Sequence, residues 1–308
     1  MPSSAAAATE LARVAASFGR QFYVRSCSGA WEERVAVTRG KRTDVCVGDE
    51  VEVRLIGSDQ AVIETLQPRR TTLQRSDRWR SKLLAANVDQ AGIVVAGEPP
   101  FSEALLVRML IAIESAGIGA ALIVNKSDLP GATRAIAARI DVYRALGYRV
   151  FEIAARAHPL EARAQLRDWL AGRTTLLVGQ SGMGKSTLVN TLVPDAALRT
   201  QAISAALSSG RHTTTFSRMF EVPAEVAPDA RIVDTPGFQS FGLAHLSEWQ
   251  RVHAMREFVP LLGRCRFNNC HHRDEPACAI REAVERGEID PLRYRLYLQI
   301  EGEPDQGS

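Results

Sequence analysis

The sequence predicts a multidomain protein with a small N-terminal β-barrel, a central α/β domain and a C-terminal helical domain built around a metal site. Three observations predict this organisation. Short strands follow one another closely before residue 70, apolar strands alternate with helices between about 83 and 240, and Cys and His cluster after residue 240. The expected boundaries are a frayed tail or short helix over 1–17, the barrel over 18–70, the α/β domain over 71–240 and the metal-binding domain over 241–308.

Length and composition are those of an ordinary globular chain. The 308 residues allow two or three domains, and 45% are hydrophobic and 24% charged. No apolar run approaches the ~20 residues of a membrane span, and the Ala-rich start contains Glu10 and Arg13, unlike a signal peptide. We therefore expect a cytoplasmic monomer with no membrane partner. The net charge of +3 is too small to indicate a nucleic-acid partner by itself.

The first domain is expected to be a barrel of the OB type. Its strands are separated by turn signals such as Val47-Gly48-Asp49, and they are expected over Phe22–Arg25, Val35–Thr38, Glu50–Ile56 and Ala61–Leu66. OB-type barrels often bind nucleic acid. A basic stretch follows, with one acid, Asp77, among Arg69, Arg70, Arg75, Arg78, Arg80 and Lys82. A solvated linker and an RNA contact explain this stretch equally well.

The α/β domain is expected to contain a mostly parallel, doubly wound sheet. Its near-continuous apolar strands are Ala91–Ala96, Ala120–Val124, Val150–Ile153, Thr175–Val178 and Arg231–Val233, and the intervening helices are Glu103–Ser115, Thr133–Leu146 and Leu160–Leu170. Ligands of such sheets bind at the carboxyl ends of the strands. Sequence motifs follow three of these strands.

The first motif is a phosphate-binding loop. Thr175–Val178 runs into a match to G-x-x-x-x-G-K-S/T, which is followed by a helical pattern. The residues expected to bind the nucleotide here are Gly179, Gln180, Ser181, Gly182, Met183, Gly184, Lys185, Ser186 and Thr187. The glycines allow backbone N–H groups to surround phosphates. Lys185 is expected to contact the β- and γ-phosphates, and the Ser186 hydroxyl is expected to bind magnesium.

The second motif selects the base. Asn125, Lys126 and Asp128 follow Ala120–Val124 and fit N-K-x-D. The Asp128 carboxylate can accept from the two donors on the Watson–Crick edge of guanine, whereas adenine would leave that charge unpaired. We expect Asn125 to brace neighbouring loops and the Lys126 stem to cover the base. Beside a phosphate-binding loop, this motif indicates a GTPase.

The third motif is D-x-x-G, formed by Asp234 and Gly237 after Arg231–Val233. Asp234 is expected to reach magnesium and the Gly237 amide to sense the γ-phosphate. Between this motif and the phosphate-binding loop, Thr213, Thr214 and Thr215 are candidates for a second magnesium ligand; we assign Thr214, although the sequence leaves all three open.

The order of the motifs is unusual, because N-K-x-D precedes the other two. The same sheet can form if the chain is circularly permuted, since domain termini usually lie close together. The chain then leaves the GTPase domain directly after D-x-x-G. Whatever follows is tied to a loop that senses the nucleotide.

A metal site is expected in the segment that follows. Cys265, Cys270, His272 and Cys278 contribute three of the five cysteines, with His271 as an alternative ligand. In a cytosolic protein such clusters favour metal over disulfides. Three thiolates and an imidazole form a closed, structural zinc site. We expect one Zn²⁺ per chain.

The permuted motif order, the N-terminal barrel and the pattern C-x4-C-x-H-x5-C resemble the RsgA family (also called YjeQ or EngC) of bacterial GTPases that depend on the small ribosomal subunit. The resemblance covers about residues 18 to 300 and includes Val47–Asp49, Asn87–Gln90, Gly210–Thr215 and His272–Cys278. It implies an OB fold, a permuted GTPase domain and a zinc domain. It also implies binding of the small (30S) subunit and its rRNA during late maturation, with GTP hydrolysis linked to release.

The resemblance also bears on individual residues. C-x-H selects His272 over His271 as the zinc ligand. Where Ras-like enzymes place a water-orienting Gln after D-x-x-G, this chain has Phe238, and the resemblance favours His212 as the catalytic substitute over a solvated loop histidine. Ile153-Ala154-Ala155 departs mildly from the usual Ser-Ala loop behind guanine, where a backbone N–H can serve.

Two functions remain open at this stage. The first is an RNA-dependent GTPase that acts in ribosome assembly. The second is an RNA-binding regulator gated by GTP and GDP, whose turnover is incidental. The complete set of magnesium and phosphate ligands favours the first.

Overall fold

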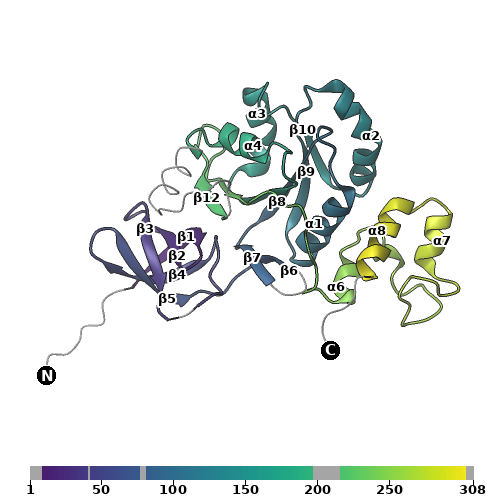
Figure 1. Ribbon diagram of the computed structural model, residues 1–308, viewed down its shortest axis with the longest axis horizontal. Coiled ribbons are helices and arrows are strands. Elements are labelled where there is room, and N and C mark those ends of the chain that lie inside the picture. Colours follow the sequence, from purple (N-terminus) through teal and green to yellow (C-terminus); the bar gives the residue numbers. More distant parts are fainter. Residues whose placement is uncertain (1–8, 41, 77–80, 197–215, 303–308) are drawn as a thin grey trace.

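A computed structural model describes residues 9–40, 42–76, 81–196 and 216–302. Figure 1 shows three parts in chain order: a barrel, a central α/β domain, and a C-terminal group of helices on the far side of that domain. The predicted fold class is confirmed in all three parts. Among the described helices, none combines the length and apolarity needed to cross a bilayer.

The barrel is closed by five strands, namely β1 (Thr9–Phe18), β2 (Gln21–Ser26), β3 (Arg34–Thr38), β4 (Glu50–Ile56) and β5 (Gln60–Leu66). Antiparallel pairings join β1 to β2 and β4, β2 to β3, and β4 to β5. A parallel pairing between β3 and β5 completes the circle. Alternate side chains such as Val14, Val24, Val53 and Ile63 fill the interior, as the period of two in a strand requires.

The prediction of a tail or short helix over 1–17 is wrong for residues 9–17, which belong to β1. Alanine favours helix, and the Ala-rich composition concealed a period of two. Ala12 and Val14 are fully buried in the barrel core, and after a bulge at Ala15 the buried Ala16 pairs with Tyr23. Pairing with β2 and β4 overrides the weak local preference, so the barrel begins at Thr9 rather than at residue 18.

The basic stretch after the barrel forms a hairpin and is not a linker. Antiparallel strands β6 (Thr72–Ser76) and β7 (Ser81–Ala86) make up this two-stranded sheet. Arg69 Nε donates to the buried Asp49 carboxylate at 2.6 Å, and Arg70 pairs with Asp89 at 2.9 Å. These two arginines therefore support the junction with the barrel. Asp77, Arg78 and Arg80 lie outside the described residues.

The central domain is the expected doubly wound sheet. Its strands are β8 (Gln90–Val95), β9 (Gly119–Val124), β10 (Arg149–Glu152), β11 (Thr174–Gly179), β12 (Arg218–Glu221) and β13 (Arg231–Asp234). The order β10-β9-β8-β11-β13 is parallel throughout, and β12 is antiparallel to β13. A single antiparallel contact between Ala16 and Arg218 connects β12 to β1 of the barrel.

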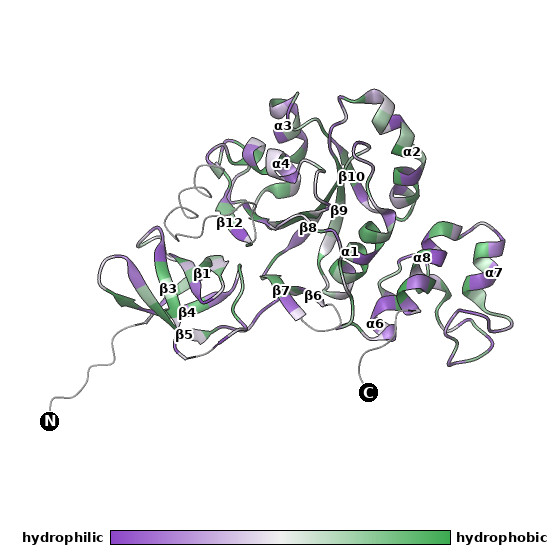
Figure 2. Cartoon of the chain, viewed as in Figure 1, coloured by the Kyte–Doolittle hydropathy of each residue, from purple (hydrophilic) through white to green (hydrophobic). Residues whose placement is uncertain are grey.

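Helices cover both faces of this sheet. They are α1 (Glu103–Ser115), α2 (Pro130–Ala145), α3 (Pro159–Leu170) and α4 (Lys185–Leu192). One apolar core contains side chains of α1 and α2, and a second contains side chains of α3 and α4. The strands between them, β8 and β11, are buried along their whole length, and Figure 2 shows hydrophobic segments at the centre of this domain, around the β9 label. Burial on both faces explains their continuous apolar sequence.

The C-terminal part consists of α6 (Glu248–His253), a 3₁₀ turn η1 (Val259–Leu261), α7 (Ala279–Glu285) and α8 (Pro291–Glu301). Its apolar side chains join the same core as those of α1 and α2. Arginines reinforce this contact: Arg139 of α2 donates to Asp290 at 2.7 Å, and the Arg293 guanidinium of α8 lies 5.0 Å from the ring centroid of Tyr143. The C-terminal helices are therefore docked on the α/β domain.

Candidate functional site

The phosphate-binding loop connects β11 to α4. Gly184, immediately before α4, has a left-handed backbone (φ 85°), and a Cβ there would lie 2.3 Å from Nδ2 of Asn125. Both the conformation and the close approach require glycine. The loop thus presents the N-terminus of α4, a favourable place for phosphate.

Asn125 attaches this loop to the base-reading motif. Its Nδ2 donates to the Met183 carbonyl at 3.1 Å, while its Oδ1 accepts from the Ala155 amide, also at 3.1 Å. Asn125 is buried, so these hydrogen bonds also satisfy an otherwise costly amide. Lys126 adds two donations from Nζ, to the Glu98 carbonyl at 2.7 Å and to the Gly182 carbonyl at 3.0 Å.

These segments enclose a cavity of about 610 Å³, within the range of nucleotide-sized ligand pockets. All three motifs contribute to its wall, which is lined by Asn125, Lys126, Asp128, Leu129, Arg156, Gln180, Ser181, Gly182, Gly184, Lys185, Ser186, Thr187, Pro236 and Gly237.

Three of the residues assigned to nucleotide binding do not line this cavity. The Met183 side chain lies in the apolar core, and that residue contributes its carbonyl to Asn125. Gly179 ends β11 beneath the loop, and Asp234 reaches the cavity wall through Lys185. Sequence reasoning missed Leu129, Arg156 and Pro236. Their signal was position, since Leu129 and Arg156 directly follow segments already assigned to the base and Pro236 lies within D-x-x-G.

Two opposite charges lie side by side at the wall of the cavity. Lys185 Nζ lies 2.5 Å from Asp234 Oδ1 and also contacts the Thr235 carbonyl. Both residues are largely buried, so the two charges compensate each other where isolated charges would be expensive. The hydroxyl of Ser186 and the carboxylate of Asp234 are oxygen donors of the kind that magnesium prefers.

The D-x-x-G segment continues alongside the phosphate-binding loop. Phe238 N donates to the Gly179 carbonyl at 3.0 Å, and Ser181 N donates to the Phe238 carbonyl at 3.4 Å. A Cβ on Gly237 would lie 3.0 Å from Cα of Ser181, so a side chain there would require the loop to shift by a few tenths of an ångström. The Phe238 ring is buried and packs edge-to-face on Phe241. His212, Thr213, Thr214 and Thr215 lie outside the described residues.

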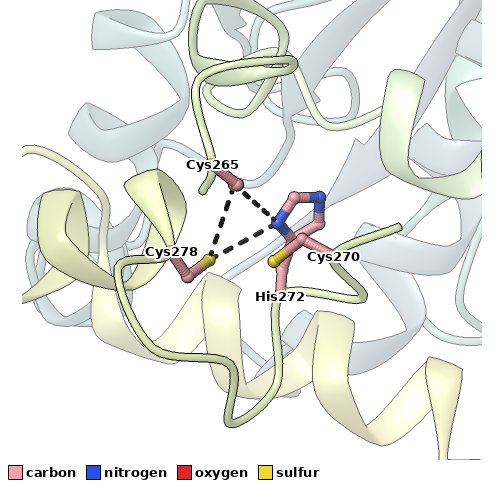
Figure 3. A group of neighbouring side chains, drawn as sticks. All are labelled: Cys265, Cys270, His272 and Cys278. Carbon is pink, nitrogen blue, oxygen red and sulfur yellow. Dashed lines mark hydrogen bonds between the residues drawn. The ribbon is translucent and has the colours of Figure 1, made fainter. Parts of the chain in front are cut away.

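Figure 3 shows the second site, where Cys265, Cys270, His272 and Cys278 converge. Their ligand atoms all lie within 4.8 Å of one another. The Sγ atoms of Cys265 and Cys278 are 3.9 Å apart, and each lies 3.5 Å from Nδ1 of His272. Tetrahedral zinc with ordinary bond lengths has S–S edges of about 3.8 Å and S–N edges of about 3.6 Å. The donor set therefore fits a zinc ion.

Local structure explains the choice between the neighbouring histidines. His272 has a left-handed backbone (φ 60°) that directs its ring toward the thiols, and the Tyr294 hydroxyl donates to its carbonyl at 2.7 Å. His271 faces away, with Nδ1 2.6 Å from a Glu248 carboxylate oxygen. Burial lowers the pKa of His272, which favours the neutral imidazole that binds metal.

Comparisons with known proteins agree with this geometry. A family model described as RsgA GTPase matches residues 66–244. Proteins named small ribosomal subunit biogenesis GTPase RsgA are 49% identical over 294 residues in Paraburkholderia xenovorans, covering 95% of this chain and 93% of that protein, and 49% identical in Burkholderia pseudomallei, covering 96% and 92%.

Two solved structures share the architecture. The crystal structure of YjeQ from Thermotoga maritima matches 96% of this chain and all of its own, with a TM-score of 0.72 and 25% identity. YloQ, described as a circularly permuted GTPase, matches 99% of each chain with a TM-score of 0.69 and 23% identity, which bears on the fold alone.

Proposed function

Because this chain belongs to the RsgA GTPase family, we propose that it binds the small ribosomal subunit and its rRNA late in the maturation of that subunit, and that GTP hydrolysis is stimulated by the subunit and linked to release. The observation that carries the proposal is the single cavity in which N-K-x-D, the phosphate-binding loop and D-x-x-G meet. Relatives named for small-subunit biogenesis supply the partner. The proposed location is the cytoplasm, and the proposed state is a monomer.

We assign the nucleotide-binding roles within this cavity as follows. Asp128 accepts from the guanine edge, while Asn125 holds the base-reading loop against the phosphate-binding loop. Lys185 leaves Asp234 to contact the β- and γ-phosphates, and the N-terminus of α4 adds its amides. These positions orient the phosphates and fix the plane of the base.

Magnesium would be held by Ser186 and Thr214, with Asp234 in the outer shell. When bound, it neutralises charge that develops on the phosphate oxygens. Zinc would be held by the three cysteines and His272, where a closed coordination shell makes it structural. This ion would fix the loops between η1 and α8. The proposed functional units are the barrel, from Thr9 to residue 70, the GTPase domain over 71–240 and the zinc-binding domain over 241–308.

GTP turnover measured with and without purified small subunits tests the proposal. We expect slow turnover alone and strong stimulation by subunits. Subunit binding should be tighter with a non-hydrolysable GTP analogue than with GDP, and it should weaken as salt rises, because contacts from arginines to phosphate release counterions. Equal affinity in the two nucleotide states, or an unstimulated rate, would contradict it.

A further inference from the structure

Arg75, on strand β6, contacts the segment that follows D-x-x-G. Its guanidinium carbon lies 5.4 Å from the ring centroid of Phe238, and its Nη1 donates to the Ser240 carbonyl at 3.3 Å. The next residue continues the contact, since Ser76 N donates to the Gly242 carbonyl at 3.1 Å. A guanidinium can stack on a ring and donate sideways at the same time, which an ammonium cannot do.

The backbone of Phe238 is hydrogen-bonded to the phosphate-binding loop. Its amide and carbonyl form hydrogen bonds with Gly179 and Ser181, and the preceding Gly237 is in close contact with Ser181. Displacing Phe238 would therefore displace Gly237, whose amide we assign to the γ-phosphate. Arg75 thus contacts Phe238, the residue directly after the Gly237 amide that we assign to the nucleotide.

Hydrogen bonds hold the β6–β7 hairpin, which carries Arg75, to the barrel on one side and to His245 on the other. Ala86 N, at the end of β7, donates to the Val47 carbonyl of the barrel at 2.8 Å, and Asn87 Nδ2 donates to the Gly48 carbonyl at 3.0 Å. The Ser76 hydroxyl lies 2.7 Å from both the amide and Nδ1 of His245. In Figure 1, β6 and β7 accordingly lie between the barrel and α6. The hairpin connects the barrel to the segment after D-x-x-G.

We propose that Arg75 is a positioning residue for GTP hydrolysis, which holds Phe238 so that the D-x-x-G backbone stays aligned with the phosphate-binding loop. The inference rests on the proposed GTPase site. Phe238 cannot hydrogen-bond a water molecule, so its contribution is to fix the backbone that precedes it. Small misplacements in an active site cost large factors in rate. Arg75 therefore affects the chemical step more than nucleotide affinity.

The test compares Arg75→Met with Arg70→Met, measuring kcat, KM, the affinity for a non-hydrolysable GTP analogue and the unfolding temperature. Arg70 lies in the same basic stretch but pairs with Asp89 and Asn87. We expect Arg75→Met to lower kcat by about tenfold or more, with KM and affinity within about twofold. Arg75→Lys should fall between it and wild type, and Arg70→Met should keep the kcat, KM and analogue affinity of wild type.

A double-mutant cycle identifies the partner of Arg75. In a Phe238→Leu background, Arg75→Met should lower kcat by much less than in wild type, because the shared contact is already lost. Wild-type kcat in Arg75→Met, or a lower unfolding temperature with unchanged kcat, would overturn the inference. If the wild-type protein itself hydrolyses no GTP, the proposed function fails, and that result is distinct from failure of Arg75 alone.

Discussion

Lys185 Nζ lies 2.5 Å from Asp234 Oδ1, which joins the phosphate-binding loop to D-x-x-G through a buried ion pair. We propose a separate role for each partner, Lys185 toward phosphate and Asp234 toward magnesium, and on that proposal the ion pair competes with the ligand. The free-energy cost of breaking the pair is offset only when phosphate binds Lys185 and magnesium binds Asp234. Nucleotide binding is thereby coupled to the position of the switch segment.

Asp234→Ala should separate these two roles. Without the competing carboxylate, Lys185 is free to bind phosphate, so the affinity for GDP in the absence of magnesium should rise by about tenfold, or ~1.4 kcal/mol. GTP hydrolysis in the presence of magnesium should fall. Titrations with fluorescent GDP, with magnesium and with EDTA, measure the first effect. Weaker GDP binding by the variant in EDTA would show that the ion pair does not compete with phosphate.

Asp128→Asn should change the choice of base. The variant loses a pair of charge-assisted hydrogen bonds to guanine, which should cost about 3 kcal/mol or more. It should favour xanthosine nucleotides, whose ring has a carbonyl where guanine has an amino group. Competition between GDP and XDP measures the preference. An unchanged preference for guanine would remove the base-reading role from Asp128.

Much of this site was predictable because it depends on local patterns. The helix expected over Glu103–Ser115 has those bounds in the structure, and Thr175–Val178 lies within β11. Strong periodicity and a rigid loop motif do not depend on distant partners. Asn125 was expected to brace neighbouring loops, but its two partners, the Met183 carbonyl and the Ala155 amide, follow only from the strand order.

What was missed depends on contacts between segments distant in sequence. β1 could not be distinguished from a helix without its partners β2 and β4. The basic stretch was ambiguous because an arginine in sequence does not reveal its acceptor, whether Asp49 for Arg69 or the Ser240 carbonyl for Arg75. Docking of the C-terminal helices was equally hidden, because Arg139 and Asp290 are 151 residues apart.

That docking contact leads to a prediction about stability. Arg139 donates to both Glu103 and Asp290 and is half-buried, so Arg139→Met should lower the free energy of unfolding by about 1–3 kcal/mol. Arg144→Met is a matched control on the same helix. Its ion pairs with Asp141 and Glu152 are exposed and should contribute at most about 0.5 kcal/mol. Denaturant titration at neutral pH measures both.

The same contact should depend on pH. The hydrogen bond from Arg139 lowers the pKa of Asp290, so its stabilisation is complete above the unfolded value of about 3.9 and is lost as the pH falls below it. The stability difference between wild type and Arg139→Met should therefore shrink in acid. A difference that stays constant between pH 7 and pH 3 would exclude Asp290 as the partner responsible.

From the metal site we expect one zinc ion per purified chain. The variant Cys270→Ser should lose this ion. Cys27→Ser is the control, because Cys27 is exposed and lies in the barrel. Small zinc modules draw folding free energy from the metal, so the loops between η1 and α8 should become protease-sensitive while nucleotide binding survives. Metal analysis and limited proteolysis measure these effects. Zinc retained at one equivalent by Cys270→Ser would exclude the four-ligand site.

The last prediction concerns the start of hydrolysis. The Phe238 ring is buried against Phe241 and cannot orient water, so another group must do so. We propose His212, which lies beside the candidate magnesium-binding threonines in sequence, because an imidazole can position or deprotonate water near neutral pH. His212→Ala should keep GTP and subunit binding but lose most of the subunit-stimulated rate, with little change in the slow basal rate.

His212→Asn separates two roles, since it can form a hydrogen bond to water but cannot accept its proton. Recovery of the stimulated rate in His212→Asn would assign positioning alone to the imidazole, whereas full stimulation of His212→Ala would place the catalytic group on the ribosome.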